Sequence, residues 1–365
     1  MKPTSAVLTR RATLLGAAAG ASLAAPAVAQ SGPRVLTMVT TWPRGLSGLW
    51  TGVERFTARV NAMSGGALQI EAFAAGEKMG AFDSFPAVQS GEADMYHAAE
   101  YYWQGRDKAY NFFTTVPFGF TAEEHTAWIR TGGGQALWDE LSASYGLKGL
   151  MCGNTGVQMG GWYERPIETL DDMKGLKIRI PGIAADIFRA LGSEPVSLPG
   201  GAIPQALFNG EINAVEWVGP YNDLDFGVQK VLQNYMFPGF HEPGTCASLG
   251  VNLALWNSLS ETERTIIETA AATENRTMLA EYSANSGRAL KQMVREYGTN
   301  VARFPDDIYA EVAALAAETI TGIGQGSDFA RRVVGSFQAF REQVMPYSNA
   351  LTAKYGALRA TQLGS

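Results

Sequence analysis

The sequence predicts an α/β protein that folds as two lobes braced by a long helix. Short apolar runs typical of strands alternate with segments whose apolar residues recur at helical spacing, which indicates a mostly parallel sheet. Of the 365 residues, about 336 remain after the first 29. A chain of this length is larger than a single hydrophobic core usually supports. A helical pattern then runs from 258 to 297, long enough to span two lobes.

The first predicted lobe comprises residues 34–153 and 245–285. It opens with an alternating apolar run at 35–40, followed by helical spacing from Leu49 to Met63 and a Ser-Gly-Gly stop. The chain is expected to return to this lobe through a strand at 248–255. The remaining elements predicted here are strands at 68–73, 93–98 and 148–152 and helices at 82–91 and 123–145.

The second predicted lobe comprises residues 154–244 and 300–345. It contains a strand that ends at Arg179, helices at 184–191 and 203–209, and a strand at 214–218. Ser258-Leu-Ser-Glu261 has the form of a capping box and would start the long helix. Residues 305–365 look helical throughout, and the last helix, within 346–365, has little core of its own.

The first 29 residues have the pattern of a twin-arginine signal peptide. Arg10 and Arg11 precede a Gly/Ala/Leu-rich stretch and the small-residue cleavage pattern Ala27-Val28-Ala29. The apolar stretch, about 15 residues, is shorter than the roughly 20 that a spanning helix needs. We therefore expect export to the periplasm and cleavage after Ala29, which would change the formal net charge from −6 to −9. So acidic a chain is not expected to bind nucleic acid.

Only two cysteines, Cys152 and Cys246, occur in the chain. A disulfide framework is therefore excluded as the source of stability. The two could pair with each other, but we favour two buried free thiols.

Arg179 is the first candidate for chemistry. It stands at the end of a predicted strand, just before Pro181-Gly182. A guanidinium fork suits a small carboxylate, because two parallel hydrogen bonds fix the position and orientation of the anion together. The alternative is a structural arginine paired with a neighbouring acid.

Three short motifs place Arg179 in a known context. They are Gly153-Asn-Thr-Gly-Val-Gln-Met-Gly-Gly-Trp162, the Arg179 strand itself, and Glu216-Trp-Val-Gly-Pro220. In this order and spacing they resemble the solute-binding proteins of tripartite ATP-independent periplasmic (TRAP) transporters, in the branch that binds α-keto acids. The resemblance covers nearly the whole chain from Val35 onward.

The resemblance implies a two-lobed periplasmic binding-protein-like fold with a hinge cleft, a long spanning helix and a helical C-terminus. It implies a subunit that captures a small monocarboxylate, a 2-oxo acid such as pyruvate or a 2-hydroxy acid, and delivers it to the membrane permease subunits. It also implies a homodimer in which the C-terminal helix reaches across to a second subunit. The sequence leaves open that this helix folds back on its own chain.

Motif by motif, the resemblance also assigns site residues. Arg179 would bind the ligand carboxylate, and the cation would lie between Gln158, Glu216 and the carbonyl of Trp217. Further positions implied at the ligand are Gln158, Trp217, Glu242, Asn154 and Tyr101, the last within the run Tyr101-Tyr102-Trp103. The chain has His241-Glu242-Pro243-Gly244 where the family usually has Trp-Glu-Gly-Gly, so the shape of this wall and the exact substrate stay open.

A charge tally supports an ion. Arg179, Glu216 and a monocarboxylate ligand together carry one net negative charge, and uncompensated buried charge is costly. One sodium ion would balance it, held by the oxygen ligands that hard cations prefer. If Glu242 is also ionised, the tally favours calcium.

The alternative function is a secreted enzyme acting on a small carboxylate. His97, His125 and His241 lack metalloprotease spacing, and the chain has no Gly-x-Ser-x-Gly motif. No nucleophile with an adjacent base stands out, so we expect a binding protein and no enzyme.

Overall fold

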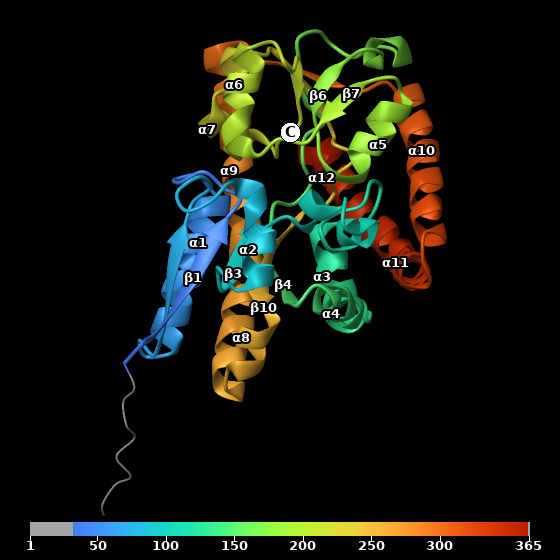
Figure 1. Ribbon diagram of the computed structural model, residues 1–365. Helices are drawn as coiled ribbons and strands as arrows, with labels where there is room; N and C mark the ends of the chain where they lie inside the picture. Colours follow the sequence, from blue (N-terminus) through green and yellow to red (C-terminus); the bar gives the residue numbers. More distant parts are fainter. Residues whose placement is uncertain (1–31, 364–365) are drawn as a thin grey trace, which may run out of the picture. The chain divides into compact units, whose positions relative to one another are not determined.

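The computed structural model describes residues 32–363, and the chain from Arg34 onward forms one compact unit. The predicted signal peptide, 1–29, lies outside the described residues. The described part is mixed α/β with two sheets, a long helix and a helical C-terminus, so the predicted fold class is confirmed (Figure 1).

The first sheet has five strands in the order β2-β1-β3-β10-β4. Strand β1 (Arg34–Thr40) runs parallel to β2 (Leu68–Phe73) and to the central strand β3 (Met95–Ala98). Helix α1 (Leu49–Met63) connects β1 to β2, and α2 (Ser84–Ser90) connects β2 to β3. The returning strand β10 (Cys246–Asn252) is antiparallel to β3 and to β4 (Leu147–Asn154). The expected return of the chain to this sheet is thus confirmed.

The second sheet has six strands in the order β11-β9-β5-β8-β6-β7. Next to the edge strand β7 (Glu194–Val196), β6 (Lys177–Arg179) is parallel to both β7 and β8 (Ala214–Val215). On the other side β5 (Gly161–Tyr163) is antiparallel to β8 and β9 (Asn234–Phe237), and β11 (Asn300–Arg303) forms the edge. Strands β7, β9 and β11 were not predicted.

Several predicted boundaries are corrected. The strand predicted at 248–255 ends at Asn252, whose side chain caps α8 (Leu253–Ser258) by accepting from Leu255 N at 3.0 Å. The helix predicted at 123–145 is two helices, α3 (Ala122–Thr131) and α4 (Gly134–Ser144), because Gly133 adopts a φ of 87° between them. The strand predicted at 214–218 stops at Val215, which leaves Glu216 and Trp217 in the loop that follows.

Helix α9 (Glu261–Tyr297) is the long helix, about 55 Å from end to end. The predicted capping box at Ser258–Glu261 is wrong: Ser260 is the cap, and its side chain and that of Glu263 bond each other's backbone amides. Ser258 instead ends α8. Helix α9 packs against strand β4 of the first sheet and against helix α1. It also packs against α7 (Pro220–Phe226), the helix that follows β8 of the second sheet (Figure 1).

The other helices surround the sheets and end the chain. Helix α10 (Asp306–Gln325) packs against α5 (Gly182–Ala190) and against α11 (Asp328–Tyr347) (Figure 1). After α11 a π-helical segment, Ser348–Ala353, leads into α12 (Lys354–Leu363). The remaining helices are α6 (Ile203–Phe208) and the 3₁₀ turns η1 (Ala81–Asp83), η2 (Glu100–Trp103), η3 (Lys108–Phe113), η4 (Leu170–Met173), η5 (Gly200–Ala202) and η6 (Val228–Lys230).

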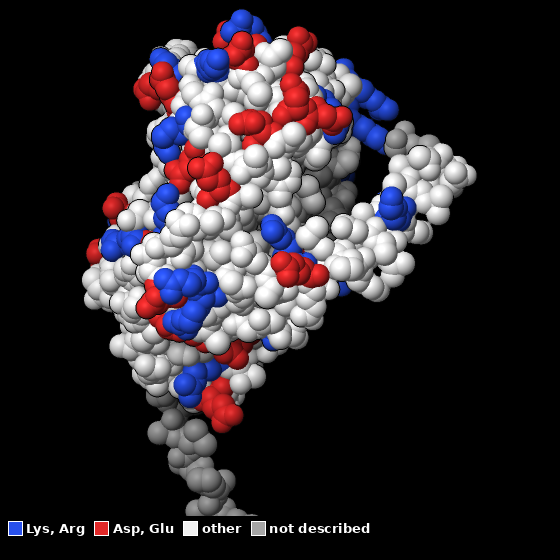
Figure 2. Space-filling view, turned by 90° about the vertical axis from the view of Figure 1, so that its right-hand side faces the viewer, with Lys and Arg blue, Asp and Glu red and all other residues white. Residues whose placement is uncertain are grey.

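Both cysteines are buried free thiols, as favoured from the sequence. Cys152 on β4 and Cys246 on β10 belong to two different hydrophobic clusters, so the two thiols contribute to separate cores. No helix within residues 32–363 combines the length and the apolar character that crossing a membrane requires. On the face that Figure 2 shows, acidic and basic side chains are interspersed in small groups.

Candidate ligand and cation site

Two parallel strands bring Arg179 and Glu216 together. Arg179 is the last residue of β6 and pairs in register with Val215, the last residue of β8. Because the carboxyl ends of parallel strands meet at one edge, the residue after Val215 lies beside Arg179. The backbone agrees, since Glu216 N donates to Arg179 O at 2.9 Å.

The Arg179 side chain is fully buried and is held by backbone carbonyls. Its Nε donates to Leu198 O at 3.0 Å and its Nη1 to Glu216 O at 2.7 Å. Nη1 also lies 3.4 Å from the Glu216 carboxylate, and Nη2 lies 3.4 Å from the Tyr102 hydroxyl. The guanidinium is therefore oriented through Nε and Nη1, while Nη2 keeps donor capacity toward an anion.

Glu216, His241 and Glu242 form a buried cluster. Each offers a ligand atom, and these atoms all lie within 4.8 Å of one another. His241 Nε2 lies 3.3 Å from Glu216 Oε1 without hydrogen-bond geometry. Glu242 is positioned on both sides, because Thr245 donates its hydroxyl to the carboxylate and Gln158 N donates to Glu242 O at 3.0 Å.

Several buried polar atoms at this point have no hydrogen-bond partner in the described chain. They are Gln158 Oε1, Glu216 Oε1, Trp217 Nε1 and both ring nitrogens of His241. The Gln158 amide is oriented by its Nε2, which donates to Thr155 Oγ1 at 3.0 Å. Buried acceptors are almost always satisfied, so the unpartnered oxygens of Gln158 and Glu216 are open to a cation, whereas Trp217 Nε1 carries a hydrogen and could only donate to an anion.

The electrostatics of the cluster agree. Burial raises the pKa of Glu216 to about 8, against the opposing effect of Arg179. Burial, with the negative charge of Glu216, raises the pKa of Glu242 to about 7. Burial lowers the pKa of His241 to about 4, so its imidazole is neutral at pH 7. One arginine does not compensate two buried carboxylates, and a bound cation would hold both of them ionised.

A small cavity of about 20 Å³ lies next to the cluster, because its lining includes Trp217, which follows Glu216, and Thr245, which donates to the Glu242 carboxylate. Its polar or aromatic walls include Tyr101, Gln158 and Trp217 from the predicted set, and also Trp42 and Tyr102. The other lining residues are Leu49, Ala99, Thr155, Val218, Thr245, Cys246 and Ala247. The lining thus combines segments next to the first sheet with segments next to the second.

The remaining predicted residues lie differently. Asn154 is fully buried, but its Oδ1 accepts from Gly156 N at 2.8 Å and its Nδ2 lies 3.4 Å from Gly244 O, so both polar atoms face backbone. Trp103 packs in the aromatic core, where its ring lies 4.9 Å from that of Phe85. Within the run 101–103, Tyr101 and Tyr102 reach the cavity.

Two further residues support the walls and were missed from the sequence. Trp42 Nε1 donates to His97 Nδ1 at 2.7 Å, and burial lowers the pKa of His97 to about 4, so a neutral imidazole holds Trp42 in place. Asp223 accepts from Gly219 N at 3.0 Å and from Trp162 Nε1 at 2.8 Å, which fixes the loop that follows Trp217. Trp42 lies just beyond the carboxyl end of β1. Open α/β sheets bind ligands at the carboxyl ends of their strands, so this position could have indicated Trp42 from the sequence.

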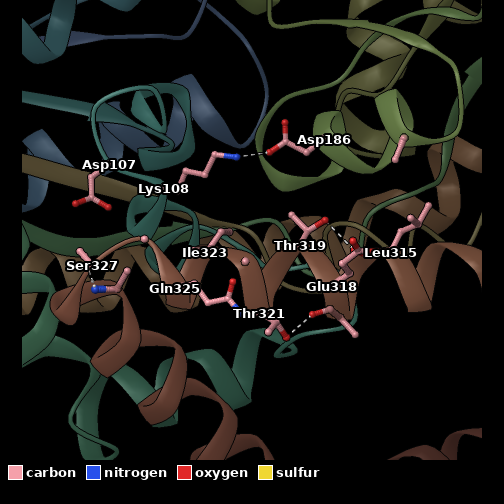
Figure 3. Close-up of a pocket in the computed structure, with 15 residues that line it drawn as sticks. Asp107, Lys108, Asp186, Leu315, Glu318, Thr319, Thr321, Ile323, Gln325 and Ser327 are labelled. Atoms are coloured by element: carbon pink, nitrogen blue, oxygen red, sulfur yellow. Dashed lines mark hydrogen bonds and ion pairs between the residues drawn. The ribbon is translucent and has the colours of Figure 1, made fainter.

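A larger open groove of about 1120 Å³ lies elsewhere, along α10. Figure 3 shows Lys108 and Asp186 on its wall, joined by an ion pair of 2.9 Å. Its volume exceeds that of the cavity, but its lining includes none of the predicted site residues, whereas Tyr101, Gln158 and Trp217 line the smaller cavity. We therefore place the candidate site at the smaller cavity.

Comparison with known proteins defines the class. The model of the bacterial extracellular solute-binding protein family 7 matches residues 40–322. A TRAP transporter solute-binding protein from Bordetella bronchiseptica RB50, described as a mixed occupancy dimer with copurified calcium and picolinate, superimposes with a TM-score of 0.87 at 30% identity over 91% of this chain and 100% of that one. A TRAP solute-binding protein from Pseudoalteromonas atlantica T6c with bound sodium and pyruvate gives a TM-score of 0.86 at 33% identity over 89% of this chain and 98% of that one.

A curated relative is closer in sequence. The monocarboxylate 2-oxoacid-binding periplasmic protein of Nostoc sp. (strain PCC 7120) is 36% identical over 318 residues, which cover 87% of each chain. The chain belongs to the extracellular solute-binding protein family 7, whose members here are the solute-binding subunits of TRAP transporters. It is a binding protein and not an enzyme, as the sequence predicted.

Proposed function

We propose that this chain captures a small monocarboxylate together with a cation and delivers the acid to a TRAP membrane permease. One observation carries the proposal: the buried Arg179 guanidinium, with donor capacity left on Nη2, lies beside Glu216, whose Oε1 has no hydrogen-bond partner among the described residues, and next to a small cavity. The ligand carboxylate would bind Nη2 of Arg179, and the α-oxygen of a 2-oxo or 2-hydroxy acid would complete the coordination of the cation.

The cavity walls favour a ligand with one charge. Beyond the polar groups, the lining consists of aromatic and aliphatic side chains such as Trp42, Leu49 and Val218. A second carboxylate there would be buried without a partner, at a cost of several kcal/mol. The relatives that bind pyruvate, picolinate and monocarboxylate 2-oxoacids support a monocarboxylate.

The cation in the proposal lies between Gln158 Oε1, the Glu216 carboxylate and the Trp217 carbonyl. If Glu216 is the only ionised carboxylate of the protein at the site, the charge balance favours sodium. If Glu242 is ionised as well, the charge balance favours calcium. Relatives hold one or the other.

Ligand entry requires the walls to separate, because a cavity of about 20 Å³ holds little more than one water. We assign the moving walls to two lobes, 34–153 with 245–285 and 154–244 with 300–345, connected by α9. Binding would then select the closed form.

The C-terminal helix supports a homodimer. Tyr347, Leu351, Tyr355 and Leu358 recur at helical spacing and are 69%, 52%, 66% and 56% exposed. An apolar stripe of this kind favours burial against a second copy of the chain. Truncation after Arg341 should convert a dimer into a monomer in light scattering, whereas a wild-type monomer would refute this part of the proposal.

Export by the twin-arginine route completes the proposal. Replacing Arg10 and Arg11 together by Lys should retain the precursor in the cytoplasm, and unaltered export would point to another route.

Isothermal titration calorimetry tests the central claim. Protein stripped of ligand and metal should bind pyruvate or lactate in sodium or calcium buffer and should bind 2-oxoglutarate at least tenfold more weakly. Analysis of the recovered acid should show no chemical change; turnover would revive the enzyme alternative. Absence of binding by every monocarboxylate tested would overturn the proposal.

A further inference from the structure

The segment 101–111 contacts both the cavity and helix α5. Its first residues line the cavity, and the Tyr102 hydroxyl lies 3.4 Å from Nη2 of Arg179. Gln104 and Lys108, further along the segment, contact α5, the helix that begins shortly after Arg179. The segment belongs to the first proposed lobe and α5 to the second. These contacts therefore join the two lobes.

Gln104 bonds the backbone at the start of α5. Its Nε2 donates to Gly182 O at 3.3 Å, and its Oε1 accepts from Asn111 Nδ2 at 3.1 Å. Asn111 is fully buried and also donates to Lys108 O at 2.9 Å. The groups that hold the Gln104 amide thus all lie in the first lobe, so this lobe by itself orients the donor toward α5.

The start of α5 lies directly on the segment. Gly182 adopts a φ of 68°, which favours glycine. A Cβ at this position would come within 3.1 Å of Asn111 Oδ1 and 3.4 Å of Tyr101 Cδ1, so backbone packs here without an intervening side chain. Gly182 and Arg179 are close neighbours in the chain. A movement of α5 away from the segment would therefore break the Gln104 bond and displace Arg179.

An ion pair adds a second contact one turn further along α5. Lys108 Nζ lies 2.9 Å from Asp186 Oδ2 (Figure 3). Asp186 also pairs with Arg189 on its own helix, at 2.7 Å, so its charge stays compensated when the lobes separate. Lys108 and Asp186 both line the open groove along α10, where solvent screens their attraction. We therefore expect this pair to contribute less than the Gln104 contact.

We propose that Gln104, Asn111 and Lys108 form a latch that holds α5, and with it Arg179, against the first lobe in the closed form. None of the three lines the cavity, so they act as positioning residues. The latch rests on the proposed function, because it presupposes closure of the lobes on a bound acid. Its contacts exist only after closure, so they should slow ligand release more than they change ligand entry.

Stopped-flow fluorescence of the mature chain in calcium buffer tests the latch, with pyruvate as the probe. Trp42 and Trp217 line the cavity, and their fluorescence should report ligand binding. Gln104→Ala should raise the dissociation rate of pyruvate at least fivefold and change its association rate less than twofold. Gln135→Ala is the matched control, because Gln135 Nε2 also donates to a backbone carbonyl, Gly149 O at 2.9 Å, but within the first lobe. Its pyruvate kinetics should equal those of wild type.

Thermal unfolding separates a latch from a merely structural role. Without pyruvate, the melting temperature of Gln104→Ala should stay within about 2 °C of wild type. The increase produced by saturating pyruvate should be smaller in the variant, because the latch stabilises only the closed form. An equal loss of melting temperature with and without pyruvate would make Gln104 a structural residue and overturn the inference.

A charge exchange gives a test that does not depend on Gln104. Lys108→Glu should speed pyruvate release, because two acids then face each other, and adding Asp186→Lys should slow it again. Release at the wild-type rate in both Lys108→Glu and a folded Gln104→Ala would refute the latch. If wild type binds pyruvate and these variants do not differ from it, only the latch fails; if wild type binds no monocarboxylate with any ion, the proposed function fails.

Discussion

Replacing Arg179 tests the anion site most directly. The guanidinium donates from Nε to the Leu198 carbonyl and from Nη1 to the Glu216 carbonyl, and its Nη2 points toward Tyr102. In Arg179→Lys a single ammonium cannot satisfy both carbonyls and still reach the ligand. We expect pyruvate affinity to fall at least tenfold, which corresponds to about 1.4 kcal/mol.

Arg179→Ala removes the charge as well. The ligand carboxylate would then be buried without its cationic partner, and truncating one member of a buried charge pair costs roughly 2–5 kcal/mol. That range corresponds to an affinity loss of about 30-fold to several thousand-fold. Loss of the donor to the Glu216 carbonyl should also lower the melting temperature.

The assay is calorimetry of pyruvate binding at fixed calcium, with thermal unfolding as the check on folding. Arg55→Lys is the control, because Arg55 pairs with Glu274 and Glu281 on α9 and does not line the cavity. Its pyruvate affinity should stay within twofold of wild type. A folded Arg179→Ala protein that binds pyruvate as tightly as wild type would refute the anion assignment.

Three further outcomes follow from the structure. Glu216→Gln should weaken pyruvate binding and flatten its dependence on sodium or calcium, because ion and acid bind with reciprocal coupling; an unchanged ion response would make Glu216 a structural acid. Burial raises the pKa of Glu100 from 4.5 to about 7, so the folded state binds more protons between these values and its stability falls as pH rises through this window. The stability of Glu100→Gln relative to wild type should therefore increase by about 3 kcal/mol between pH 4.5 and pH 7. An unfolding free energy that changes with pH by the same amount in both proteins would contradict this. Small-angle scattering should show a smaller radius of gyration with saturating pyruvate, and an unchanged radius would argue against lobe closure.

Local patterns determined most of the elements. The alternation of apolar residues located β1 and β2, and helical spacing with a Ser-Gly-Gly stop gave both ends of α1. These signals are local, because side-chain period and turn chemistry act within a few residues. Where two local signals competed, the prediction failed: Ser258 and Ser260 both precede a glutamate at capping distance, and only the end of α8 decides between them.

The sequence also placed part of the candidate site. Arg179 ends one short strand and Glu216 follows another, and parallel pairing of those strands brings the two residues to one edge. Gln158 could be assigned only by resemblance. Asn154 was expected at the ligand, but its amide hydrogen-bonds the backbone of Gly156 and Gly244 in the adjoining loops.

Only the tertiary structure decided which loops converge. His241 reaches Glu216 from the β9–β10 loop, and Trp42 reaches the same cavity from the end of β1. Nothing near His241 in the sequence shows that its ring nitrogens have no hydrogen-bond partner among residues 32–363, since burial and hydrogen bonding depend on segments far away in the chain. The sequence alone determined the strands and the side chains at their ends. Packing of the two sheets across one cavity determined which of those side chains meet, because contacts between distant segments exist only after the intervening chain has folded.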